Sequence, residues 1–180
     1  MTRQELYQLA DERKINNTQN CLVQFQTDSK TMLTEESLKE MHMLLGGTGV
    51  YRTEDLQSKP IGIKPPEAGE LPRLMGHFIS QLQISRQMFH PIEYATICHK
   101  RILELYPFKD KNEEVAFLLL NVLLMQGGYQ PITIEETQRA EYISKLQAAQ
   151  HPSHPDIDGF ITFIVECEVR RQESIIDRCQ

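Results

Sequence analysis

The most apolar stretch of the chain lies near its middle. Between Val115 and Met125 the one polar residue is Asn121. This stretch is shorter than the ~20 residues that a membrane span requires, and apolar residues all round a helix are typical of a helix buried on every side. Polar residues precede it and Gly127-Gly128 follows it, as at the two ends of a helix. We predict a buried central helix from Asn112 to Gln126.

Helical periodicity recurs on both sides of this segment. Start signals mark several helices: Thr34 with Ser37, Pro91, Thr133, and either Asp156 or Asp158. The predicted flanking helices span residues 2–14, 34–45, 71–84, 91–106, 133–150 and 160–177. Residues 15–31 are polar and predict a loop, with an extended piece at 21–25 as an option. The pattern predicts an all-α fold of about seven helices around the buried central helix, with one exception.

The exception is residues 49–64, where two short apolar runs enclose a polar turn at 53–58. This pattern predicts a β-hairpin, and Pro65-Pro66 end it. A hairpin that projects from a helical domain can pair with an extended peptide through its main chain. The alternative is a surface hairpin that binds nothing.

Length and charge limit the class of protein and the kind of partner that the sequence allows. The chain has 180 residues and a net charge of −6 without a basic cluster, so we expect one domain and no nucleic-acid partner. We divide it into an N-terminal helix and loop (1–33), a core (34–150) and a C-terminal helix packed on the core (151–180). The four cysteines have no paired spacing, and we find no signal peptide or membrane span. We predict a cytoplasmic protein, and leave open secretion as an effector and the oligomeric state.

Histidines outside the central segment offer little chemistry. His99 falls on the apolar side of the helix that starts at Pro91, where a hydrogen-bonded core residue is the usual finding. His151 and His154 lie in a proline-containing turn with Asp156 and Asp158, which favours a loop over a metal site.

The approach to the central helix resembles the Fic-domain family. Its residues are Tyr-Pro-Phe-Lys-Asp-Lys-Asn-Glu-Glu-Val-Ala-Phe at 106–117, and the family motif is His-Pro-Phe-x-Asp/Glu-Gly-Asn-Gly-Arg-x-x-Arg. The leucine-rich continuation to Gly128-Tyr129 is also similar. Upstream, Gly49-Val50-Tyr51-Arg52-Thr53 resembles the Gly-x-Tyr-Arg segment of the family, and Lys64-Pro65-Pro66 its prolines. The resemblance covers about residues 34–150 and implies the Fic fold.

The resemblance also assigns roles to positions. In the family the motif histidine deprotonates a target hydroxyl, which attacks a nucleotide phosphate, commonly transferring AMP to Ser, Thr or Tyr. Tyr106 occupies that histidine position, and Asp110 the Mg²⁺-binding position. The nucleotide-binding positions hold Lys111, Asn112, Glu113, Glu114 and Phe117, and the hairpin would be the flap that holds the target peptide through Tyr51, Arg52, Thr53, Ile61, Gly62 and Ile63.

The substitutions oppose that chemistry. A phenol with a pKa of about 10 is a poor proton acceptor at pH 7 beside an imidazole of about 6.5. Glu113 and Glu114 bring negative charge to a phosphate site, and two unit charges 4 Å apart interact by about 4 kcal/mol at an effective dielectric constant of 20. We expect a degenerate Fic protein without cofactor that binds a protein partner through the flap. The alternative is a transferase with another donor, pose or base, which would use Mg²⁺ and ATP or a related donor; a fold with no surviving role is the third option.

Overall fold

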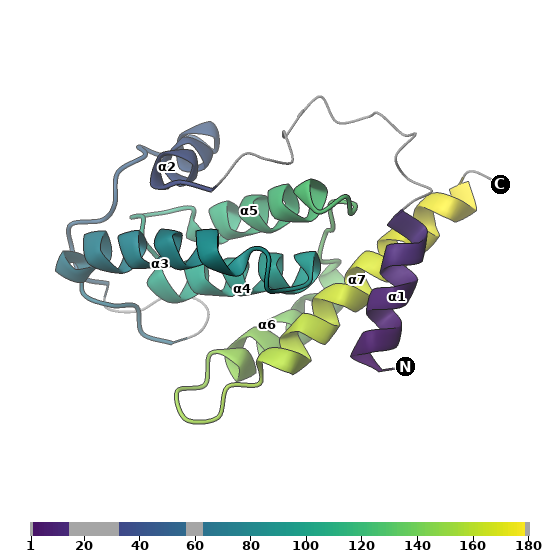
Figure 1. Ribbon diagram of the computed structural model, residues 1–180. Helices are drawn as coiled ribbons and strands as arrows, with labels where there is room; N and C mark the ends of the chain where they lie inside the picture. The colour runs from purple at the N-terminus through teal and green to yellow at the C-terminus, as the bar shows by residue number, and fades with distance from the viewer. Residues whose placement is uncertain (1, 15–32, 57–62, 179–180) are drawn as a thin grey trace.

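The computed structural model describes residues 2–14, 33–56 and 63–178. Within these ranges it contains seven α-helices and two short 3-10 helices, and no β-sheet (Figure 1). The elements are α1 (Arg3–Lys14), α2 (Glu35–Leu44), η2 (Ala68–Glu70), α3 (Leu71–Ser85), α4 (Pro91–Leu105), α5 (Asn112–Gln126), η3 (Glu136–Gln138), α6 (Arg139–Ala149) and α7 (Ile157–Arg178). The predicted all-α fold is confirmed. None of the helices in these ranges combines the length and apolarity needed to cross a membrane.

The central helix is α5, with the bounds that the sequence predicts. It packs mainly along α4, with α2 on another side (Figure 1), and its residues Val115, Leu119 and Leu120 are fully buried. The expected burial on every side is wrong, because Phe117, Leu118, Asn121, Val122 and Met125 are only half-buried and Glu114 is exposed. The incomplete cover on this side leaves room for a groove, described below.

The C-terminus of α5 ends in a Schellman motif, as the glycine pair predicts. The amide of Gly128 donates to the Met125 carbonyl and the amide of Tyr129 to the Leu124 carbonyl, both at 2.9 Å. Gly128 has φ +86°, a left-handed conformation that costs a residue with Cβ about 1–2 kcal/mol.

Replacing Gly128 with alanine is therefore expected to lower the free energy of unfolding by about 1 kcal/mol. Urea denaturation followed by circular dichroism measures it. The control is Gly69→Ala, because a Cβ at Gly69 meets nothing within 4 Å and its φ is not in the positive range. Equal effects of the two substitutions would contradict the left-handed requirement.

Three of the predicted helix starts are confirmed and one is wrong. Helix α4 begins at Pro91, as predicted. Thr34 and Ser37 form a reciprocal capping box at α2, and the Asp156 carboxylate accepts a hydrogen bond from the Gly159 amide (2.8 Å) in the first turn of α7. Thr133 does not start a helix: α6 begins only at Arg139, after η3. The reason is a competing signal, since the side chain of Glu135 forms the capping box instead, with Gln138.

The predicted hairpin is not seen in the part of 49–64 that the structure describes. Tyr51 forms an isolated antiparallel bridge with Phe108, and the Arg52 amide donates to the Pro107 carbonyl (2.9 Å). Residues 49–52, the first arm of the predicted hairpin, thus pair through their main chain with the α4–α5 loop. Thr53 and Ile63 are exposed and in no strand, whereas Ile61 and Gly62 lie outside the described residues.

The buried face of α2 includes a histidine. His42 is buried, whereas Leu44 in the last turn is 75% exposed. His42 follows Leu38 by four residues, so both lie on the same face of the helix. The spacing was therefore a signal for the burial of His42, which residue type alone did not suggest.

Candidate functional site

The loop between α4 and α5 is the centre of the candidate site. It is bounded by two left-handed residues that are not glycine: Tyr106, which ends α4 with φ 47°, and Lys111, which precedes α5 with φ 55°. Such conformations persist only where surrounding contacts fix them. Three buried polar side chains supply those contacts.

Asn112 ties the loop to the first turn of α5. Its side-chain oxygen accepts from the Phe108 amide (2.8 Å), and its side-chain nitrogen donates to the Phe108 carbonyl (2.9 Å). Both residues are buried, and Phe108 is fully so. The pair of bonds satisfies the main chain of Phe108, and the loop is closed on itself.

Arg52 also holds the loop in place. Its side chain donates to three main-chain carbonyls: Nε to Tyr106 (2.9 Å), Nη1 to Glu54 (3.1 Å) and Nη2 to Pro66 (2.5 Å). Burial lowers the pKa of the guanidinium, and the nearby Asp55 carboxylate opposes that shift. These hydrogen bonds join the first arm of the predicted flap, the segment before η2 and the loop.

His42 is the third contact, and the sequence interpretation missed it. Its Nδ1 accepts a hydrogen bond from the Gly49 amide (3.1 Å), so the proton is on Nε2, which donates to the Asp110 carboxylate (3.0 Å). The ring stacks on Phe108 with centroids 4.0 Å apart. A Cβ at Gly47 would lie 2.1 Å from His42 Nε2, so this ring position depends on glycine.

Tyr106 lies beside the acidic first turn of α5. Partial burial and then the negative charges of Glu113 and Glu114, with a hydrogen bond to Glu113, raise the pKa of its phenol to about 12. A group with that pKa stays protonated at neutral pH. Tyr106 is thus a hydrogen-bond donor in this site.

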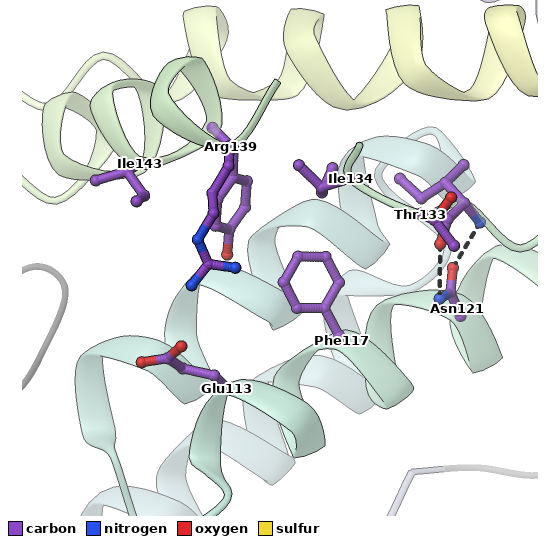
Figure 2. A pocket seen from close by; sticks show the side chains of 9 residues that line it. Glu113, Phe117, Asn121, Thr133, Ile134, Arg139 and Ile143 are labelled. Carbon is purple, nitrogen blue, oxygen red and sulfur yellow. Dashed lines mark hydrogen bonds between the residues drawn. The ribbon is translucent and has the colours of Figure 1, made fainter. Parts of the chain in front are cut away.

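A groove runs from Glu113 along α5 towards α6. Its volume is about 320 Å³, and it is lined by Glu113, Phe117, Asn121, Ile132, Thr133, Ile134, Arg139, Tyr142 and Ile143. Figure 2 shows the Phe117 ring between α5 and the segment of Ile134, with the Arg139 guanidinium directed towards the end where Glu113 lies. The side chain of Asn121 forms two hydrogen bonds with the main chain of Ile132: Nδ2 donates to the carbonyl (3.0 Å) and Oδ1 accepts from the amide (2.8 Å). Because these polar atoms are already paired, the middle of the groove is largely apolar.

His99 lies under the groove as a core residue, as predicted. Its Nδ1 donates to the Ala116 carbonyl and its Nε2 accepts from the Tyr142 hydroxyl, both at 2.8 Å. Full burial lowers the pKa of the imidazole to about 4, so the ring is neutral and both nitrogens are used. His99 has no lone pair left for a substrate.

Carboxylates suited to a metal are sparse. No group of three His, Cys, Asp or Glu side chains gathers in the part of the chain that the structure describes. The side chain of Asp110 is 63% exposed and one of its oxygens is bound to His42. Mg²⁺ in phosphate-transfer sites needs only one or two carboxylates together with substrate phosphates, so Asp110 fits such a role only when a phosphate is bound beside it.

The structure thus brings most of the sequence-predicted residues together. Tyr106 to Glu114 form the loop and the first turn of α5, and Tyr51 and Arg52 contact that loop. Phe117 lies one turn further along, in the groove. Thr53 and Ile63 are exposed.

Comparisons with known proteins agree with this arrangement. The family model of the Fic/DOC family matches residues 32–124. The chain is 39% identical over 110 residues to the Protein adenylyltransferase Fic of Aedes aegypti, which covers 61% of this chain and 21% of that protein. It is 36% identical over 143 residues to the protein of that name from Drosophila virilis, and this match covers 77% of this chain and 29% of that protein. The match therefore spans less than a third of either relative.

Solved structures show the same fold. A Fic domain containing signaling protein from Bacteroides thetaiotaomicron superposes with a TM-score of 0.71 at 21% identity, covering 94% of this chain and 68% of the other. Fic-1 from C. elegans superposes with a TM-score of 0.67 at 23% identity, covering 82% of this chain and 45% of the other.

Proposed function

The chain belongs to the Fic/DOC family, and on that premise we propose that it binds a protein partner and does not transfer AMP by the histidine-dependent route of the family. The observation that carries this proposal is the environment of Tyr106, which occupies the position of the family histidine. Its phenol has a pKa of about 12, raised by burial and by Glu113 and Glu114.

The phenol of Tyr106 is a poor proton acceptor at neutral pH. With a pKa of about 12, only about one phenol in 10⁵ is ionised at pH 7, whereas a general base works best with a pKa near the working pH. His99 does not replace it, because both of its ring nitrogens are already hydrogen-bonded in the core. We infer that neither Tyr106 nor His99 accepts the proton of a target hydroxyl in the way that the family histidine does.

The negative charge at the start of α5 also argues against binding of a nucleotide in the family pose. Helix N-termini attract anions through their free amides, but here Glu113 and Glu114 already occupy the first turn. A triphosphate placed against this turn would meet two carboxylates, and Lys111 offsets one of them. We infer that nucleotide binding in the family pose is weak, and that Asp110 has no phosphate-bound Mg²⁺ to hold.

The partner-binding half of the proposal is supported by the surface next to the loop. Val50 is 62% exposed, Met43 is 51% exposed and Leu44 is 75% exposed. Met43 lies beside the first arm, since a Cβ at Gly49 would be 2.9 Å from its Cγ. Adjacent exposed apolar side chains are typical of interaction sites, and we propose that Tyr51 to Thr53 and their neighbours contact the partner.

The proposal is tested by titrating the protein with ATP and Mg²⁺ in a calorimeter. We expect no submicromolar binding, and no transfer of radiolabel from α-labelled ATP to lysate proteins. A variant carrying Tyr106→His, Glu113→Gly, Glu114→Arg and Phe117→Arg is expected to bind ATP at least about tenfold more tightly, because it removes two anions and adds two cations.

The matched control changes charge away from the loop. Glu136→Arg in η3, which is exposed, alters the net charge with little expected effect on ATP binding. Submicromolar ATP binding by the unmodified chain would contradict the proposal. Label transfer from another nucleotide or from a CDP-linked donor would instead support the alternative, a transferase that uses a different donor or base.

A further inference from the structure

A buried carboxylate outside the groove lies on α7, the helix against which α1 packs. Glu168 on α7 is fully buried. Its Oε1 accepts two hydrogen bonds at 2.9 Å, from the Gln130 amide and from Gln172 Nε2. Its Oε2 is buried without a partner. An ionised carboxylate with a bare oxygen is costly in such a place.

The neighbouring side chain, Gln172, also has an oxygen without a hydrogen-bond partner. Gln172 is also fully buried. Its Nε2 donates to Glu168 Oε1 and to the Ala10 carbonyl of α1 (3.3 Å), whereas its Oε1 has no partner. Two acceptors, Glu168 Oε2 and Gln172 Oε1, are thus left unsatisfied on side chains that already share one hydrogen bond.

One proton removes both defects. A protonated Glu168 presents Oε2–H as a donor, and a carboxylic acid pairs with an amide through two parallel hydrogen bonds. The existing Nε2–H···Oε1 bond is one of them, and Oε2–H···Oε1 of Gln172 is the other. The carbonyl oxygen of the neutral acid keeps both of the bonds that it accepts.

We propose that α1 docks on α7 in a proton-dependent manner: the docked state holds Glu168 as the neutral acid, and loss of its proton loosens α1. Figure 1 shows α1 lying along α7 at the periphery of the fold. The amide of Gln172 connects the two helices directly through Ala10, so the pairing of Glu168 with Gln172 bears on the docking of α1.

Burial favours the neutral form of Glu168 more strongly than its hydrogen bonds and the neighbouring charge oppose it. Burial raises the pKa of Glu168 to about 7, against the partial opposition of its hydrogen bonds and of Arg171. Arg171 is the charged side chain whose field acts on Glu168, and its Nε is itself buried without a partner. On α1, Tyr7 is buried, and its ring stacks on His90 at the start of α4 with centroids 4.0 Å apart. Glu93 and Arg3 act on Tyr7 rather than on Glu168.

The direction of the pH effect follows. When α1 is released, Glu168 meets solvent and its pKa returns towards the ordinary 4.5. Docking therefore takes up a proton between about pH 4.5 and about pH 7, and weakens up to about tenfold for each unit that the pH rises in this window. Above that window the carboxyl is ionised in both states, and the docking equilibrium no longer changes with pH.

Hydrogen exchange of the α1 amides tests the proposal on the full chain. After correction for the chemical exchange rate, we expect protection of α1 to fall roughly 50- to 100-fold between pH 5 and pH 8. Glu168→Gln introduces a neutral side chain whose amide can donate to Gln172 Oε1. Protection of the α1 amides in this variant is therefore expected to be independent of pH. Glu166→Gln is the matched control on α7 and should retain the pH dependence of the unmodified chain.

A second measurement does not depend on a variant that folds. The side-chain carboxyl carbon of Glu168, followed by NMR in the unmodified protein, is expected to titrate with a pKa of about 7. A carboxyl that titrates near 4.5, or α1 protection that is equal at pH 5 and pH 8, would overturn the proposal.

Discussion

Replacing Phe108 with alanine is expected to lower the free energy of unfolding by about 3–5 kcal/mol, the usual cost of truncating a buried phenylalanine. Phe108 is fully buried and lies at the centre of the α4–α5 loop. Its ring stacks on His42 and meets Tyr51 at a centroid distance of 5.6 Å. The cavity would therefore open where α2, the first arm and the loop meet, so the loss includes contacts from three segments.

The loss is measured by urea denaturation followed by circular dichroism and fluorescence. The control is Phe89→Ala, because Phe89 is 39% exposed and its truncation is expected to cost less than about 1.5 kcal/mol. Phe108→Leu, which keeps most of the volume, should recover much of the stability. An equal loss at Phe108 and Phe89 would show that the ring is not packed as described.

The second large effect is expected at Arg52. Arg52→Met keeps most of the side-chain volume but leaves the carbonyls of Tyr106, Glu54 and Pro66 without their donor. We expect a loss of about 2–4 kcal/mol, since each unsatisfied main-chain group costs about 1–3 kcal/mol where it is buried and little where water reaches it. We also expect faster hydrogen exchange of the Phe108 amide, because the loop loses the hydrogen bond that Arg52 donates to the Tyr106 carbonyl.

Arg52→Lys separates charge from geometry. A lysine keeps the positive charge but lacks the planar fork that reaches three carbonyls at once, so it should recover less than half of the loss. Arg73→Met is the control, because Arg73 is an exposed arginine on α3 whose guanidinium pairs with Glu70. Full recovery by lysine would mean that charge, and not the directed hydrogen bonds, is what the site requires.

The positions of the helices were largely predictable because their signals are local. The bounds of α5 follow from an apolar run between a polar lead and a glycine pair, and α2 begins at the capping box of Thr34 and Ser37. Thr133 was a wrong start because two competing capping residues, Thr133 and Glu135, lie two positions apart, and sequence alone does not rank them. The resemblance at 106–117 placed the loop in the correct family and ahead of the correct helix.

The flap was not predictable in the same way. The alternation in residues 49–64 favours strands, but a strand needs a partner, and the pattern does not say which one. In the described residues Tyr51 pairs with Phe108, 57 positions later in the chain. Main-chain pairing partners at such distances depend on how the helices pack, and this is decided only when the fold forms.

By itself, the sequence determined the helices, the central place of α5 and the acidic start of that helix, because periodicity, capping and charge are properties of neighbouring residues. Only the tertiary structure decided the use of the buried polar groups. His42 meets Asp110, Arg52 meets Tyr106, and Glu168 meets Gln130, across 68, 54 and 38 positions. A polar side chain is stable in the interior only beside a matching donor or acceptor, and the packing of distant helices is what places that partner.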